Sequence, residues 1–259
     1  MIMRLLNLFF ILAMLAVSIS CEKKEPIKNS EAKLLGITLV SGNGVMDTAN
    51  KKIILKVPDI VDLTKIVPHF SISTNATIYP PSDVATDYTN PVVYTIISED
   101  KTKNYIFTVS ASKPIAKFTV YDCTNWSPTV NRIPQADAVI KIYLKAENVN
   151  TSKTYDVLTT DQNGQADFYG SKETIYLMTV HKDNKSNILN GYVLNGRYNS
   201  QAEVDSSGDP NATVGGFKYK DVNQDGRVWP DDKYNYDILW ISNYFSGVRL
   251  TDLYIASAK

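Results

Sequence analysis

The stretch PVVYTIISEDKTKNYIFTV, residues 91–109, contains two β-rich runs joined by a polar segment. Residues 92–97 and 105–109 are rich in β-branched and aromatic side chains, which favour strands. Residues 98–104 between them are polar and predict the connecting loop of a hairpin. The pattern indicates an all-β fold, because it lacks the 3.6-residue period of an amphipathic helix.

Similar short runs, separated by turn residues, recur on both sides of this hairpin. They predict strands at residues 35–40, 52–57, 68–73, 138–144, 155–160, 166–168, 175–180 and 250–255. Asn163 and Gly164 form a dipeptide that predicts a tight hairpin turn. A Lys-Pro pair at 113–114 is the natural boundary between domains. We therefore predict two β-sandwich domains in tandem, at residues 32–112 and 117–259.

Overall composition excludes some classes of function. The 259 residues include 27 basic and 27 acidic side chains, so the formal net charge is zero. A nucleic-acid-binding protein would carry a basic excess or a basic stripe, so we expect no nucleic-acid partner. Hydrophobic residues make up 44% of the chain, which is enough for packed cores and too many for a disordered protein.

The N-terminus reads as a targeting segment. Residues 1–20 contain a basic Arg4 followed by an apolar run at 5–17, too short to span a membrane. We favour lipidation of Cys21, where the apolar run ends, followed by a polar tether over residues 21–31. Ordinary cleavage after Ser20 is the alternative. Lipidation predicts attachment to a membrane through a lipid anchor, as a surface-exposed outer-membrane lipoprotein of the cell envelope.

The first predicted domain carries four segments in a specific order. They are DLTKIVP at 62–68, ATIYP at 76–80, DYTNPVVY at 87–94 and YIFTV at 105–109. Over residues 32–112 this order resembles the Ig-like domains of Bacteroidetes-type surface lipoproteins. The resemblance implies a spacer or interaction module without chemistry of its own.

The second predicted domain begins with a different pattern. ADAVIKIY at 136–143 and TDQNGQA at 160–166 resemble a prealbumin-like sandwich, also called a carboxypeptidase-regulatory-like domain. This likeness extends over about residues 117–183. The chain then departs from the family with a polar, Gly- and Asn-rich insertion at about residues 184–216, so the fold of the last third is not specified.

One segment carries the spacing of metal ligands. In DVNQDGRVWPDD at 221–232, side-chain oxygens of Asp221, Asn223 and Asp225 fall at loop positions one, three and five. Arg227 would offer its backbone carbonyl, and Asp232 occupies position twelve. The segment resembles the Ca²⁺ loop of dockerin and EF-hand proteins. A structural Ca²⁺ site is the reading we favour, and an Asx-rich turn without an ion is the alternative.

Two tryptophans are candidate ligand-binding residues. Trp126 and Trp229 lie in polar, loop-like segments, and exposed indole rings can stack on sugar rings. Aromatic residues at alternating strand positions, such as Trp240 and Tyr244, more often pack in a core or across strands.

Enzyme chemistry has little support in the sequence. There is no Gly-x-Ser-x-Gly elbow, His-Glu-x-x-His pair or phosphate-binding Gly loop, and His69 and His181 fall in different domains. Cys123 is expected as a small buried residue, with a reactive thiol as the alternative. We therefore predict a non-enzymatic extracellular binding module for a glycan or protein ligand. A structural adhesin or assembly subunit is the alternative, and an accessory hydrolase stands third.

Overall fold

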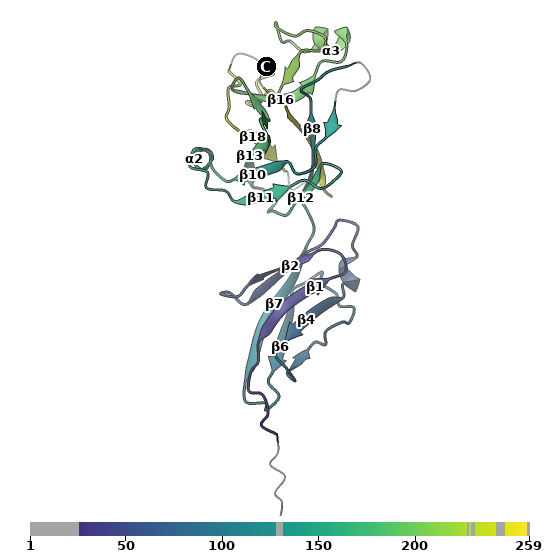
Figure 1. Ribbon diagram of the computed structural model, residues 1–259, viewed down its shortest axis with the longest axis vertical. Helices are drawn as coiled ribbons and strands as arrows, with labels where there is room; N and C mark the ends of the chain where they lie inside the picture. The colour runs from purple at the N-terminus through teal and green to yellow at the C-terminus, as the bar shows by residue number, and fades with distance from the viewer. Residues whose placement is uncertain (1–25, 128–131, 227, 229–230, 242–246, 258–259) are drawn as a thin grey trace, which may run out of the picture.

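The computed structural model describes residues 26–127, 132–226, 228, 231–241 and 247–257. It is nearly all β, with 44% strand and 6% helix, which confirms the predicted fold class. Figure 1 shows two bodies arranged one above the other along the long axis of the molecule. Among the residues that the structure describes, no helix has the length and apolar character needed to cross a membrane.

The first body, residues 26–112, packs a five-stranded sheet over a two-stranded one. The larger sheet has the strand order β2-β3-β7-β6-β5, and the smaller pairs β1 with β4. The elements are β1 Leu34–Leu39, β2 Asn43–Asp47, β3 Lys52–Lys56, the 3₁₀ helix η1 Leu63–Lys65, β4 Pro68–Ile72, β5 Thr77–Tyr79, β6 Val92–Ile97 and β7 Asn104–Ser112. All five strands expected in this region are present.

Alternation along β6 and β7 builds the core of the first body. Tyr94, Ile96 and Phe107 point inward and are buried, whereas Val93 and Ile106 point outward and are exposed. The inward rings of Tyr94 and Phe107 stack with centroids 5.6 Å apart. The core therefore follows the period of two that the sequence shows.

The second body, residues 115–257, contains two larger sheets. One has the order β11-β10-β13-β14 with β18 also paired to β13, and the other has the order β12-β8-β19 with β9 paired to β8. The elements are β8 Ala116–Asp122, β9 Ile133–Pro134, β10 Val139–Tyr143, α2 Ala146–Asn150, β11 Asp156–Thr159, β12 Gln165–Phe168, β13 Ile175–Lys182, β14 Lys185–Ser186, β18 Asp237–Trp240 and β19 Arg249–Ile255. The last strand, β19, runs parallel to β8, the first.

The two sheets enclose the core of this body. Ile140 and Ile142 of β10 are fully buried, on the face that the alternation predicts. The prediction of a hairpin at Asn163–Gly164 is wrong, because the turn is present but the strands on either side of it do not pair with each other. Gly164 donates its N–H to the carbonyl of Asp161 at 2.9 Å, but β11 and β12 on either side of the turn belong to different sheets. The turn therefore connects the two layers of the sandwich.

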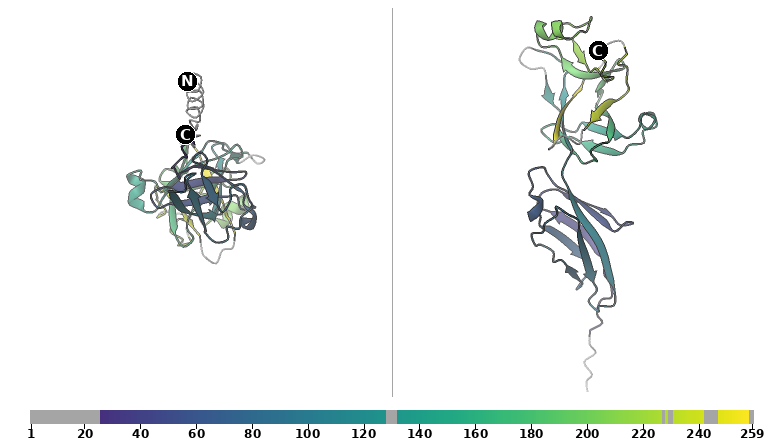
Figure 2. Two further views of the ribbon diagram at one scale, coloured as in Figure 1. Left: turned by 90° about the horizontal axis from the view of Figure 1, so that it is seen from below. Right: turned by 180° about the vertical axis from the view of Figure 1, so that it is seen from behind.

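The polar insertion is ordered and, with β17 directly after it, forms one structural element; from here on the insertion includes β17. It contains a three-stranded sheet with the order β15-β16-β17 and a short helix. Its elements are β15 Ile188–Leu189, β16 Tyr192–Arg197, α3 Gln201–Ser206 and β17 Phe217–Tyr219. Beneath this sheet lies a small core of its own, which includes Leu194, Tyr254 and Cys123. Figures 1 and 2 show α3 and β16 at the end of the second body that points away from the first.

The two bodies are joined by a short connection at residues 113–114. Ile115 and Ala116 already belong to the core of the second body. The Tyr169 hydroxyl of the second body donates to the Val57 carbonyl of the first at 3.3 Å. Each body has a separate hydrophobic core, in agreement with two folding units, and the domain limits 32–112 and 117–259 stay a prediction.

Candidate ligand-binding site

An aromatic groove of about 300 Å³ lies on the insertion sheet. It combines three aromatic rings with three polar side chains and one glycine. We name it the aromatic groove; its lining residues are Asn190, Tyr192, Asp209, Asn211, Gly216, Phe217 and Tyr219. The rings of Tyr192 and Tyr219 lie with their centroids 5.4 Å apart.

Local backbone geometry brings these side chains to one place. Asn190 and Gly191 have φ angles of 54° and 85°, so both adopt the left-handed conformation that a two-residue hairpin turn requires. This turn joins β15 to β16, and it pairs Leu189 with Tyr192. On the neighbouring β17, Phe217 and Tyr219 share one face because side chains alternate along a strand.

Polar atoms in the groove are held by specific hydrogen bonds. The Asp209 carboxylate accepts from the Tyr198 hydroxyl at 3.3 Å and from the Asn211 backbone N–H at 2.8 Å. Burial raises the pKa of Tyr219, and the charge of Asp209 acts in the same direction, while a hydrogen bond from Asn190 acts against them. The Tyr219 phenol therefore stays protonated at neutral pH and can donate to a ligand.

Arg197 fixes the insertion to the sandwich. Its guanidinium donates Nε–H to the carbonyl of Cys123, Nη2–H to that of Thr124 and Nη1–H to that of Gly215. The guanidinium carbon also lies 3.9 Å from the ring centroid of Phe217, a groove residue. One side chain thus connects the end of β8, the segment before β17 and the wall of the groove. No local pattern in the sequence indicates this role for Arg197.

Trp126 lies beside the insertion and is not one of the groove residues. Its indole Nε1–H donates to the Asn199 side-chain oxygen at 3.4 Å. A Cβ placed on Gly215 would lie 3.1 Å from the Trp126 ring, so the absence of a side chain at Gly215 permits this packing. A ligand-binding role for Trp126 stays a prediction. Trp229, Arg227 and Cys21 lie outside the described residues.

The proposed calcium loop is held by bonds within itself. Asp221 accepts from the backbone N–H groups of Asp225 and Gly226, at 3.2 and 2.9 Å. Asp232 is 1% exposed and accepts from the Val222 N–H at 2.8 Å. Across the described part of the chain, no three or more His, Cys, Asp or Glu residues form a group that could hold a metal ion. The Ca²⁺ site stays a prediction, with its ligands as named above.

Groups with potential chemical reactivity lie apart. Cys123 is fully buried, and burial raises the pKa of its thiol to about 11, so it is not a reactive thiol. His69 contacts Asp83 at 2.9 Å in the first body, while His181 lies on β13 of the second. The expected burial of Cys123 is confirmed.

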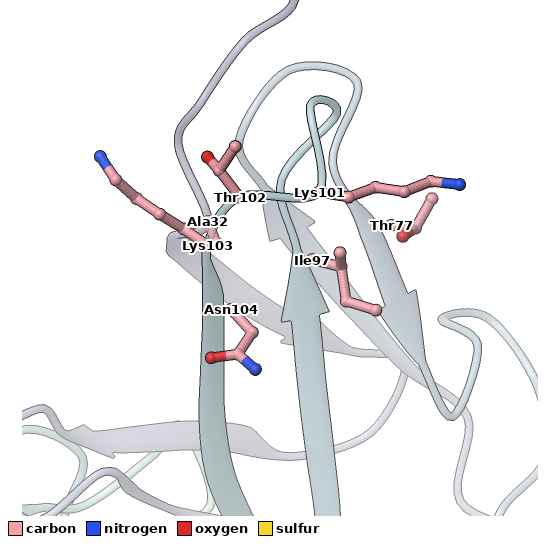
Figure 3. Close-up of a pocket in the computed structure, with 7 residues that line it drawn as sticks. All are labelled: Ala32, Thr77, Ile97, Lys101, Thr102, Lys103 and Asn104. Atoms are coloured by element: carbon pink, nitrogen blue, oxygen red, sulfur yellow. The ribbon is translucent and has the colours of Figure 1, made fainter.

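A larger depression, of about 830 Å³, lies on the first body at the end nearest residue 32. Figure 3 shows Lys101 and Lys103 diverging to opposite sides, with Ile97 between them, Asn104 below and Thr77 beneath the end of Lys101. Its lining contains no aromatic ring. The depression therefore offers no stacking surface for a sugar.

The family comparison concerns the first body alone. Residues 35–109 match the family model SGBP, N-terminal. This model represents the N-terminal part of the surface glycan-binding proteins of Bacteroidetes, a family of binding proteins. The match ends before the second body, so it does not include the aromatic groove. No curated protein matches the chain.

Several solved structures share a distant likeness. A candidate glycoside hydrolase of Bacteroides thetaiotaomicron has 16% identity and a TM-score of 0.31, covering 70% of this chain and 50% of that one. A protein of Bacteroides eggerthii from the DUF4623 family has 14% identity and a TM-score of 0.26, covering 59% and 47%. The chain thus spans about half the length of these two proteins. Likenesses with TM-scores below 0.5 establish neither the fold nor the function of this chain.

Proposed function

We propose that this protein binds glycans at the cell surface and that the aromatic groove holds the sugar. The groove carries the proposal, since it places Tyr192, Phe217 and Tyr219 beside the amides of Asn190 and Asn211. A sugar ring has apolar C–H faces, which pack on aromatic rings, and hydroxyl edges, which bond to amides and carboxylates. The family match of residues 35–109 gives independent support.

The position of the groove suits this function. Its residues belong to the insertion sheet and the segments beside it. Figures 1 and 2 show two elements of this region, β16 and α3, at the end of the second body that points away from the first. With a lipid on Cys21, as the sequence predicts, the first body would act as a spacer. The groove would then face away from an outer membrane, toward ligands outside the cell.

We expect Tyr219→Ala and Asn211→Ala each to weaken glycan binding by about tenfold, because truncation of a central contact costs more than 1 kcal/mol. Affinity electrophoresis of the purified protein in gels containing β-glucan, xylan, galactan, mucin, polygalacturonate or chondroitin sulfate would identify the ligand. Calorimetry with oligosaccharides of that ligand would measure the loss.

The matched control is Trp240→Ala, which removes an exposed aromatic ring from β18, outside the groove. Tyr219 also packs on the small core under the insertion, so thermal melts of the Tyr219→Ala variant must accompany its binding measurement to show that it is folded. Asn211 is exposed, so its variant tests the groove at little cost in stability. Unchanged affinity in the Asn211 and Tyr219 variants would contradict the proposal that the groove binds the glycan. Absence of binding to every polysaccharide would favour the adhesin-like function.

We also propose that residues 221–232 bind a structural Ca²⁺ ion. At a calcium concentration a hundred times its Kd, we expect the chelator-treated protein to gain about 5–10 °C in Tm. Asp225 is exposed, so Asp225→Ala should abolish this gain and leave the Tm in chelator nearly unchanged. A wild-type Tm that does not respond to Ca²⁺ would identify the loop as an ordinary Asx-rich turn.

A further inference from the structure

A second cavity, of about 190 Å³, lies beside the aromatic groove, and three of its four charged lining residues are basic. Arg132, Arg197 and Lys218 line it, together with the single carboxylate of Glu203. Lys218 alternates with Phe217 and Tyr219 on β17, so it projects from the opposite face of that strand. We name this site the basic cavity.

The positive charge in the basic cavity is only partly balanced. Arg132 pairs with Asp252, outside the cavity lining, at 3.1 Å. Neither Arg197 nor Lys218 has a carboxylate oxygen within 4.0 Å among the residues that the structure describes. The Glu203 carboxylate accepts the Asn199 backbone N–H at 3.1 Å. Two of the three cations, Arg197 and Lys218, therefore lack a carboxylate partner in the described part of the chain, and the one carboxylate in the cavity lining already accepts a hydrogen bond.

Such an arrangement of charges favours the binding of an anion. A partly buried cation loses hydration, and an ion of opposite charge offsets that loss. The Arg197 guanidinium has five N–H donors, and within the described part of the chain three of them bond to carbonyls, which leaves two for a ligand. Arginine forks and lysine ammonium groups match the oxygens of carboxylates and sulfates.

The basic cavity and the aromatic groove share a wall. Arg197 lines the cavity and Phe217 lines the groove, and the guanidinium carbon of Arg197 lies 3.9 Å from the ring centroid of Phe217. We propose that the basic cavity binds the carboxylate or sulfate of an acidic saccharide. This inference rests on the proposed glycan-binding function, and it names an acidic polysaccharide as the ligand class.

The test uses pairs of ligands in which one member carries an anionic group that the other lacks. Oligogalacturonate is compared with its methyl ester, and a chondroitin sulfate oligosaccharide with its desulfated form, by calorimetry at low and high salt. We expect one acidic member to bind at least about tenfold more tightly than its partner, with the difference reduced by salt. The pair that responds distinguishes a carboxylate ligand from a sulfate ligand.

Lys218→Met, which keeps the apolar stem and removes the charge, should lose this preference, and Lys218→Arg should retain it. Lys153→Met is the matched control, because Lys153 is an exposed lysine outside the cavity. Binding of neutral glycans without preference for either acidic member would overturn the inference and leave the proposed function intact. Failure of all neutral and acidic glycans would overturn both.

Discussion

Replacement of Arg197 by Met is expected to lower the free energy of unfolding by about 3 kcal/mol. Methionine keeps an apolar contact with Phe217 but donates no hydrogen bond. The carbonyls of Cys123, Thr124 and Gly215 would each lose a charged donor. Loss of this link should also loosen the insertion and weaken binding in the aromatic groove.

Urea unfolding, followed by circular dichroism and by tryptophan fluorescence, measures this effect. Trp126 packs on Gly215, so its fluorescence reports on the contact between the insertion and the sandwich that Arg197 stabilises. The control is Arg249→Met, since Arg249 is an exposed arginine that bonds to the Trp240 carbonyl, outside the insertion. A loss below about 1 kcal/mol in the Arg197 variant would mean that the three bonds contribute little in solution.

Substitution of Asp232 by Ala is the second large effect we expect, at about 2–3 kcal/mol. Asp232 is buried, and its Oδ1 accepts the backbone N–H groups of Val222 and Asn223, at 2.8 and 3.2 Å. Alanine would leave both donors without this acceptor, whether or not Ca²⁺ is bound. Asp232→Asn keeps an oxygen at this position and should cost less.

Thermal melts in chelator and in Ca²⁺ separate the two roles of the loop. We expect Asp232→Ala to lower the Tm under both conditions, and Asp225→Ala to lower it only when Ca²⁺ is present. If Asp232→Ala is silent in chelator, its hydrogen bonds do not stabilise the fold. The residue would then matter only as a metal ligand.

The strands could be predicted because their residues obey a simple local rule. In β6 and β10, alternate residues are apolar and point into a core, so burial follows sequence position. The dipeptides Asn163–Gly164 and Asn190–Gly191 show the limit of such rules. Both form turns, but only the second joins strands of one sheet. Long-range pairing decides that difference, and a dipeptide contains no information about it.

Long-range contacts are also the reason why the candidate site could not be predicted from the sequence. β15 and β17 have only two and three residues, too few to show a period. Their sheet is held by the distant contacts of Arg197, which no local pattern reveals. A signal was nevertheless present, since Tyr192, Phe217 and Tyr219 stand out in a polar segment and Asn190–Gly191 is a strong turn dipeptide. Loop-like Trp126, by contrast, lies next to the site without lining the groove.

The parallel pairing of β8 with β19 bears on how the chain is assembled during synthesis. Ala116 pairs with no earlier strand of its sheet; it lies beside Arg249, more than a hundred residues later. The ribosome must therefore release nearly all of the second body before this sheet can close. Contacts between residues so far apart in the sequence form slowly. The strands of the first body are complete at Ser112, so that body can fold while the rest is still being translated. A nascent chain would thus pass through a stage with one finished body and one exposed, unpaired β8 edge.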